Sequence, residues 1–149
     1  MNWWKFWQEE EQRGEEPDYY AEGIDLVRQE RYHEALTSFR LALRERPDAA
    51  APLEQMGVVY TRIGMTDEAL KAYRRALERE PESAGAHYGL GFRLLNRGRE
   101  EEAERHLSAF LEGAPDEQAA ARHVRHARET LEELQGKGSA PEEEGGENG

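Results

Sequence analysis

Histidines and carboxylates are the residues of this sequence that could carry chemistry. Two of the five histidines, His123 and His126, lie three positions apart and are followed by Glu129 and Glu133. On a helix this spacing would place both imidazoles on one side, where they could bind a metal ion. The same stretch is rich in arginine, however, and histidines on such a helix are usually exposed to water. The sequence therefore predicts no metal site there.

Motifs of the common enzyme classes are absent from the sequence. It contains no phosphate-binding loop, no glycine-rich dinucleotide loop and no Gly-x-Ser-x-Gly elbow. Cysteine is also absent, which removes thiolate chemistry and cysteine-ligated zinc. His87 falls on the packing side of its predicted helix, where we expect a core or groove histidine. We therefore predict no catalytic residues and no cofactor, and keep an enzyme or enzyme accessory as the rival hypothesis.

The charge of the chain argues against two classes of partner. Asp and Glu number 32 against 20 Lys and Arg, a formal net charge of −12. Such a chain repels phosphate backbones and anionic lipid surfaces, so nucleic acid is an unfavourable partner. No apolar run approaches the ~20 residues that span a bilayer, and the opening MNWWKFW is too short for a secretory signal. These features predict a cytoplasmic protein.

The elements that carry these residues repeat along the chain. The stretch 50–81 matches the sequence again after a shift of 34 residues in either direction. Each unit contains two short amphipathic segments, and a proline ends the second one. Small residues in both segments would let the two helices approach to the usual ~8–10 Å. The aligned positions are Gly23, Gly57 and Gly91; Ala35, Ala69 and Ala103; and Pro47, Pro81 and Pro115.

A period of 34 residues with two helices per unit resembles that of tetratricopeptide repeat (TPR) proteins. The resemblance implies an all-α fold, a right-handed α-solenoid superhelix of three helical hairpins in a TPR domain over 17–134. We expect repeats at about 16–49, 50–83 and 84–116 and a capping helix at 117–134. The expected repeat helices run from about Pro17 to Gln29, His33 to Arg44, Ala50 to Ile63, Asp67 to Glu80, Ala84 to Asn96, and Glu100 to Glu112.

Two features of the repeats carry further expectations. Repeat three has Leu107 followed by Phe110, where repeat two has Tyr73 followed by Ala76. This reversal of large and small residues predicts that the capping helix packs on repeat three at an altered distance or angle. The arginines of the second helices are expected to form a solvated outer face with Glu partners at i±4; they are Arg40, Arg44, Arg74, Arg75 and Arg79.

Similarity to TPR proteins also implies a binding surface. Such proteins bind extended or helical peptides along the concave face formed by the first helix of each unit. The matching inward-facing positions are Tyr20, Ile24, Val27 and Arg28; Glu54, Val58, Thr61 and Arg62; and Tyr88, Phe92, Leu95 and Asn96. From the capping helix, Arg122 and His126 would complete the rim. We expect a mainly apolar and aromatic trough, unless part of the stripe only packs between helices or is covered by the chain's own segments.

The predicted function is a non-catalytic scaffold or adaptor that binds a protein or peptide partner in this trough. The carboxylate clamp of Hsp70/Hsp90 co-chaperones is missing, because its positions here are Tyr20, Ile24, Gln55, Gly85 and Gly89. One alternative is a chaperone-like holder of an apolar cargo segment, as in type III secretion translocator chaperones, which are also small and acidic. Another is a self-assembling scaffold, and hence a homo-oligomer.

The two ends of the chain lie outside the repeats. Residues 1–16 form a leader with Trp3, Trp4, Phe6 and Trp7 followed by glutamates. This leader could cover repeat one, dock in the trough of its own or a neighbouring chain, or contact a membrane interface. Residues 135–149, rich in Gly and Glu, are predicted to be a disordered tail.

Overall fold

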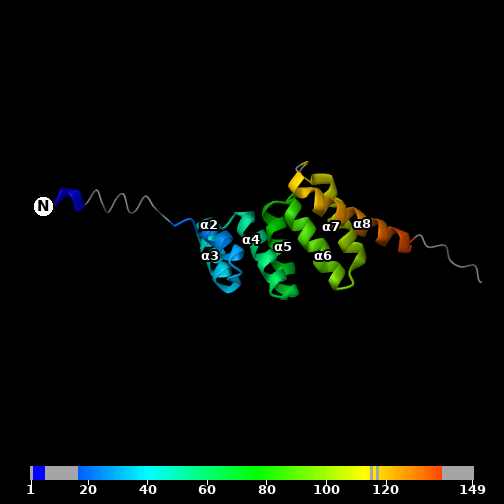
Figure 1. The fold of residues 1–149 in the computed structure, drawn as a ribbon, viewed down its shortest axis with the longest axis horizontal. Coiled ribbons are helices and arrows are strands. Elements are labelled where there is room, and N and C mark those ends of the chain that lie inside the picture. Colours follow the sequence, from blue (N-terminus) through cyan, green and yellow to red (C-terminus); the bar gives the residue numbers. More distant parts are fainter. Residues whose placement is uncertain (1, 6–16, 115, 117, 139–149) are drawn as a thin grey trace, which may run out of the picture.

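The computed structural model describes residues 2–5, 17–114, 116 and 118–138, and every regular element in them is helical (Figure 1). Residues 3–5 form one helical turn. The other elements are α2 (Tyr19–Arg28), α3 (Tyr32–Glu45), α4 (Ala50–Arg62), α5 (Thr66–Arg79), α6 (Ala84–Asn96), α7 (Glu100–Gly113), the 3₁₀ helix η1 (Gln118–Ala120) and α8 (Ala121–Gly138). The predicted all-α class is confirmed, and each predicted repeat helix is present. None of the helices described is long and apolar enough to cross a membrane.

The helices form hairpins that stack side by side. Helices α2 and α3, α4 and α5, and α6 and α7 pair within a unit, while α3 with α4 and α5 with α6 join neighbouring units. Figure 1 shows the three hairpins following one another, with α8 beside α7 at the end. Each unit thus buries its apolar face only against its neighbours, as in a solenoid.

Each hairpin turns at a residue with a positive φ. These residues are Glu30 (φ 58°), Gly64 (φ 77°) and Gly98 (φ 74°), which are equivalent positions of the three repeats. In the first turn, the Arg31 N–H donates to the Leu26 carbonyl (2.9 Å) and the Glu30 N–H to the Val27 carbonyl (2.9 Å). The same pair of bonds closes the other two turns. This is the Schellman motif, whose left-handed position favours glycine, so Glu30 is strained.

Glycine also allows the close helix pairing that the sequence predicts. A Cβ atom at Gly57 would lie 2.5 Å from Cε1 of Tyr73, and one at Gly91 would lie 2.7 Å from Cδ2 of Leu107. A Cβ atom at Gly23 would collide with the ring of Phe39. In every repeat, therefore, a large side chain of the second helix lies against the bare backbone of the first.

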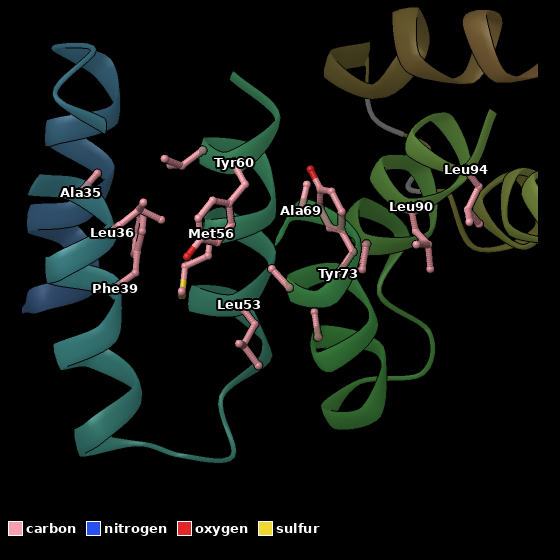
Figure 2. Close-up of a cluster of buried hydrophobic side chains, with 14 of the residues drawn as sticks. Ala35, Leu36, Phe39, Leu53, Met56, Tyr60, Ala69, Tyr73, Leu90 and Leu94 are labelled. Carbon is pink, nitrogen blue, oxygen red and sulfur yellow. The ribbon is translucent and has the colours of Figure 1, made fainter. Parts of the chain in front are cut away.

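The core runs through all the units (Figure 2). Phe39, Leu53, Leu90 and Leu94 are almost fully buried. Figure 2 shows side chains of α3 meeting those of α4, and those of α5 lying between α4 and α6. A second cluster joins the last repeat to the cap, and its buried members are Leu107, Phe110, Ala127 and Leu131. The bulky Phe110 of repeat three thus packs against α8.

The end of α8 differs from the prediction. The helix continues to Gly138, although the sequence indicated an end near 134 and a disordered tail from 135. Leu131 anchors this last part in the core, and the Gln135 side-chain amide donates to Glu104 Oε1 (3.3 Å). Residues 139–149, and Phe6 and Trp7 of the leader, lie outside the described residues.

Replacing Glu30 with glycine is expected to stabilise the protein by about 0.5–1 kcal/mol, because glycine adopts this backbone conformation without a Cβ clash. Chemical denaturation would measure the change. Gly98→Ala is the matched control: its Cβ would meet nothing within 4 Å, so backbone strain alone should destabilise the protein. A destabilised Glu30→Gly variant would contradict this account of the turn.

Gly57→Ala is expected to destabilise the protein by about 1–3 kcal/mol through overpacking against the Tyr73 ring. The loss should appear although alanine is the better helix former by about 1 kcal/mol. The control is Gly136→Ala in α8, where an added Cβ meets nothing within 4 Å. If both variants unfold at the same denaturant concentration as the wild type, the close-approach explanation is wrong.

Candidate functional site

The described part of the chain contains a hollow between the second repeat, the third repeat and the cap. Its volume is about 470 Å³, and most of its wall comes from α4, α6 and the η1–α8 segment. We call it the α4–α6–α8 hollow. Its lining residues are Glu54, Val58, Thr61, Arg62, Tyr73, Ala84, Gly85, Tyr88, Gly89, Phe92, Arg93, Phe110, Ala120, His123 and His126.

The hollow contains half of the trough predicted from the sequence. The predicted residues that line it come from repeats two and three: Glu54, Val58, Thr61, Arg62, Tyr88 and Phe92. The remaining predicted residues lie elsewhere, and most of them are used for packing. The hollow is therefore shorter than the predicted trough and lies toward the C-terminal end of the repeats.

Repeat one contributes nothing to the hollow. Tyr20 packs against Phe39 at a ring-centroid distance of 6.0 Å, and burial raises the pKa of its hydroxyl, with the charges of Glu54 and Asp18 adding to the effect. Ile24 and Val27 pack against the core. These three residues follow the alternative in which the stripe packs between helices.

Three other predicted residues also lie outside the hollow. Arg28 is exposed and pairs with Asp25 at 3.3 Å. In α6, Leu95 packs against both core clusters, while Asn96 is exposed at the end of the helix. Arg122 is exposed and does not line the hollow, whereas His126 does.

Two glycines that were not predicted as trough residues form part of the floor. A Cβ atom at Gly85 would collide with the carboxylate of Glu54, and one at Gly89 would collide with the ring of Tyr73. The Ser83 hydroxyl fixes Glu54 by donating to its Oε2 atom (2.9 Å). Small residues at i and i+4 of α6 were the available sequence signal, but it does not say which side chains of the preceding unit fill the space.

The cap supplies the third wall through its histidines. The His126 ring stacks on Phe92, with centroids 4.3 Å apart and planes at 11°, and its Nδ1 atom lies 2.9 Å from the Tyr88 hydroxyl. His123 meets the Tyr88 ring edge-on at 4.9 Å. Both histidines are exposed, as expected, but their rings also contact Tyr88 or Phe92. The described residues contain no group of three or more His, Cys, Asp or Glu side chains that could hold a metal ion.

The charged groups of the hollow are two arginines and one glutamate. Within the described part of the chain, neither Arg62 nor Arg93 forms an ion pair. Arg93 lies near Tyr88: burial raises the pKa of the Tyr88 hydroxyl, and the positive charge of Arg93 opposes that rise. The hollow therefore combines aromatic rings with available guanidinium groups.

His87 lies outside the hollow, between α6 and α7. Its Nε2 atom is 2.8 Å from the Pro81 carbonyl, and its Nδ1 atom is 3.1 Å from Nδ1 of His106. A carbonyl oxygen only accepts, so Nε2 of His87 is the donor in that contact, and of the two facing Nδ1 atoms one donates and the other accepts. His87 is thus the packing histidine that the sequence allowed.

Comparison with known proteins gives the family. Two sequence models described as tetratricopeptide repeat match residues 20–64 and 63–127. The chain belongs to the tetratricopeptide repeat family. No curated protein matches this TPR chain.

Solved TPR structures share the fold. The Yersinia enterocolitica type III secretion chaperone SycD in complex with a peptide of the translocator YopD superposes with a TM-score of 0.74 at 17% identity, covering 80% of this chain and 92% of that one. The TPR2B domain–pHsp70 complex of yeast Sti1 gives 0.69 at 13% identity, with 80% and 94% covered. A tetratricopeptide repeat protein from Parabacteroides merdae gives 0.66 at 27% identity, with 80% and 45% covered.

The His87–His106 pair is expected to make stability depend on pH. Burial lowers the pKa of His106, His87, Arg74 and Arg105 lower it further, and Glu102 opposes them. The unfolded chain therefore takes up protons more readily than the folded one. This contribution to stability is present above the ordinary His pKa of about 6.5 and is lost as the pH falls through it.

Denaturant unfolding at pH 7.5 and at pH 5.5 would measure this loss. His106→Gln should show a smaller loss than the wild type, and the exposed His33→Gln should behave as the wild type does. Equal losses in all three proteins would show that His106 takes up no additional proton on unfolding.

Proposed function

We propose that this TPR protein is a non-catalytic scaffold or adaptor that binds a segment of a partner protein in the α4–α6–α8 hollow. The proposal rests on the hollow itself, which has a volume of about 470 Å³. It is lined by Tyr88, Phe92 and Val58, with Arg62 and Arg93 beside them. This volume lies within the ~300–1,000 Å³ of typical ligand pockets. Aromatic and arginine side chains are also the types that dominate the energy of protein interfaces.

The chemistry of the wall supports binding rather than catalysis. The imidazole of His126 is held between Phe92 and the Tyr88 hydroxyl, and His87 and His106 are engaged with each other. Glu54 accepts a hydrogen bond from Ser83. The groups that could move protons near the hollow therefore serve as structural contacts, and a cytoplasmic, non-enzymatic role is part of the proposal.

A second candidate within the same class is a holder of an apolar cargo segment. The aromatic lining favours it, and the SycD complex shows a chaperone of the same fold with a translocator peptide. The two candidates share the hollow and differ in the occupant. A holder would release its segment to another protein, whereas an adaptor would keep the complex intact.

Removing the aromatic wall is expected to weaken partner binding. A displayed peptide library would first be screened against the wild-type protein to find a peptide that binds it. Fluorescence anisotropy would then measure the affinity of that peptide for each variant. Tyr88→Ala/Phe92→Ala should raise the dissociation constant at least about tenfold, because buried aromatic anchors carry most of an interface's energy.

Two further variants separate loss of the site from loss of structure. Because Tyr88 and Phe92 also hold α8, Ala120→Trp is included to fill the hollow from η1 without deleting its wall; it should weaken binding as well. Tyr19→Ala removes a ring outside the hollow and should bind as the wild type does. If all the variants bind the selected peptide equally, the hollow is not the binding site.

A further inference from the structure

The charge of the hollow is opposite to that of the chain. The whole chain carries a formal net charge of −12, whereas the lining has two arginines and one carboxylate, and that carboxylate is held by Ser83. Because neither Arg62 nor Arg93 pairs with a carboxylate among the described residues, both charges are available to a guest. The hollow therefore suits a segment that combines aromatic side chains with carboxylates.

The leader of this chain has that chemistry. Its sequence from Trp3 to Glu11 is WWKFWQEEE, and it contains every tryptophan of the protein. Trp3 and Trp4 are 71% and 57% exposed. The ring contact of Trp4 in the described structure is with the neighbouring Lys5, whose Nζ atom lies 5.7 Å from the ring centroid. Exposed tryptophans of this kind are a surface that a binding partner would bury.

We propose that the segment Trp3–Glu11 of one copy binds in the α4–α6–α8 hollow of a second copy. The aromatic side chains occupy the space beside Tyr88 and Phe92, and the glutamates neutralise Arg62 and Arg93. The donor is placed in a second copy because the leader precedes α2, which lies at the opposite end of the repeats from α8 (Figure 1). This inference rests on the proposed function of the hollow and names its occupant.

The arrangement has a consequence for the assembly. Each copy has one donor segment and one acceptor hollow, which are different surfaces. Reciprocal exchange closes a dimer, and one-way exchange extends a chain of copies. In both cases association depends on protein concentration, and it weakens with added salt because the carboxylate–guanidinium contacts are at the rim.

Sedimentation velocity of the full-length protein over a wide concentration range tests the proposal. The wild type should self-associate. The leader variant Trp3→Ser/Trp4→Ser and the hollow variant Arg62→Glu should each weaken association by roughly tenfold or more. The control Arg75→Glu makes the same charge change at an exposed position of α5 outside the hollow, and it should associate as the wild type does.

A charge exchange identifies the contact. Glu9→Lys/Glu10→Lys/Glu11→Lys places positive charges opposite Arg62, so this variant alone should associate more weakly than the wild type, as should Arg62→Glu alone. Combined in one chain, the two sets of changes should restore association, because the lysines of one copy then meet the new glutamate of the next. Circular dichroism would confirm that each variant keeps its helices.

The inference is overturned by a wild type that stays monomeric at every concentration, or by association that either the leader variant or the hollow variant leaves unchanged. Membrane binding by the leader would appear as sedimentation with vesicles that Trp3→Ser/Trp4→Ser abolishes while the protein remains monomeric, which also overturns it. The proposed function would survive these results, since it fails only if the selected peptide binds the hollow variants as tightly as it binds the wild type.

Discussion

Contact between a bare helix backbone and a large side chain sets the geometry of this protein. In each hairpin the second helix places Phe39, Tyr73 or Leu107 against a glycine of the first. Tyr73 does this twice, because it lies against Gly57 of its own unit and against Gly89 of the next. One buried ring thus fixes both the spacing within repeat two and its distance from repeat three, and so it fixes how wide the α4–α6–α8 hollow is.

Hydrogen bonds between neighbouring units also hold the stacked hairpins together. Arg40 donates to the Tyr60 hydroxyl (3.2 Å), and Arg79 donates to the Pro47 carbonyl (3.1 Å). Arg74 donates to Glu102 (2.9 Å), and this bond holds the pKa of Glu102 below its usual value. The predicted pairing of these arginines with glutamates at i±4 on their own helices was wrong. Their long side chains instead reach polar groups of a neighbouring unit.

Sequence periodicity predicted the repeats well because it reports contacts that recur in every unit. Gly57 and Tyr73 lie in aligned columns, so their pairing could be expected from the sequence. Contacts made once are not visible in this way. The close approach of Gly89 to Tyr73, the hydrogen bond from Ser83 to Glu54, and the stacking of His126 on Phe92 each occur at one junction. The left-handed Glu30 was also missed, because only its two partners in the column are glycines.

The position of the hollow follows from where the repeats stop being equivalent. At the places of Gly85 and Gly89, the second repeat has Ala51 and Gln55. The two glycines let the Glu54 carboxylate and the Tyr73 ring lie against the backbone of α6, where they line the hollow beside Tyr88 and Phe92. Because α8 closes the far side with two imidazoles, the site is bounded on three sides and open on the fourth. A uniform repeat would present a shallow stripe along its whole length, whereas in this chain Tyr88, Phe92, Arg62 and Arg93 gather around one hollow. That concentration is the physical basis for expecting one short segment as the guest rather than an extended peptide laid along all three repeats.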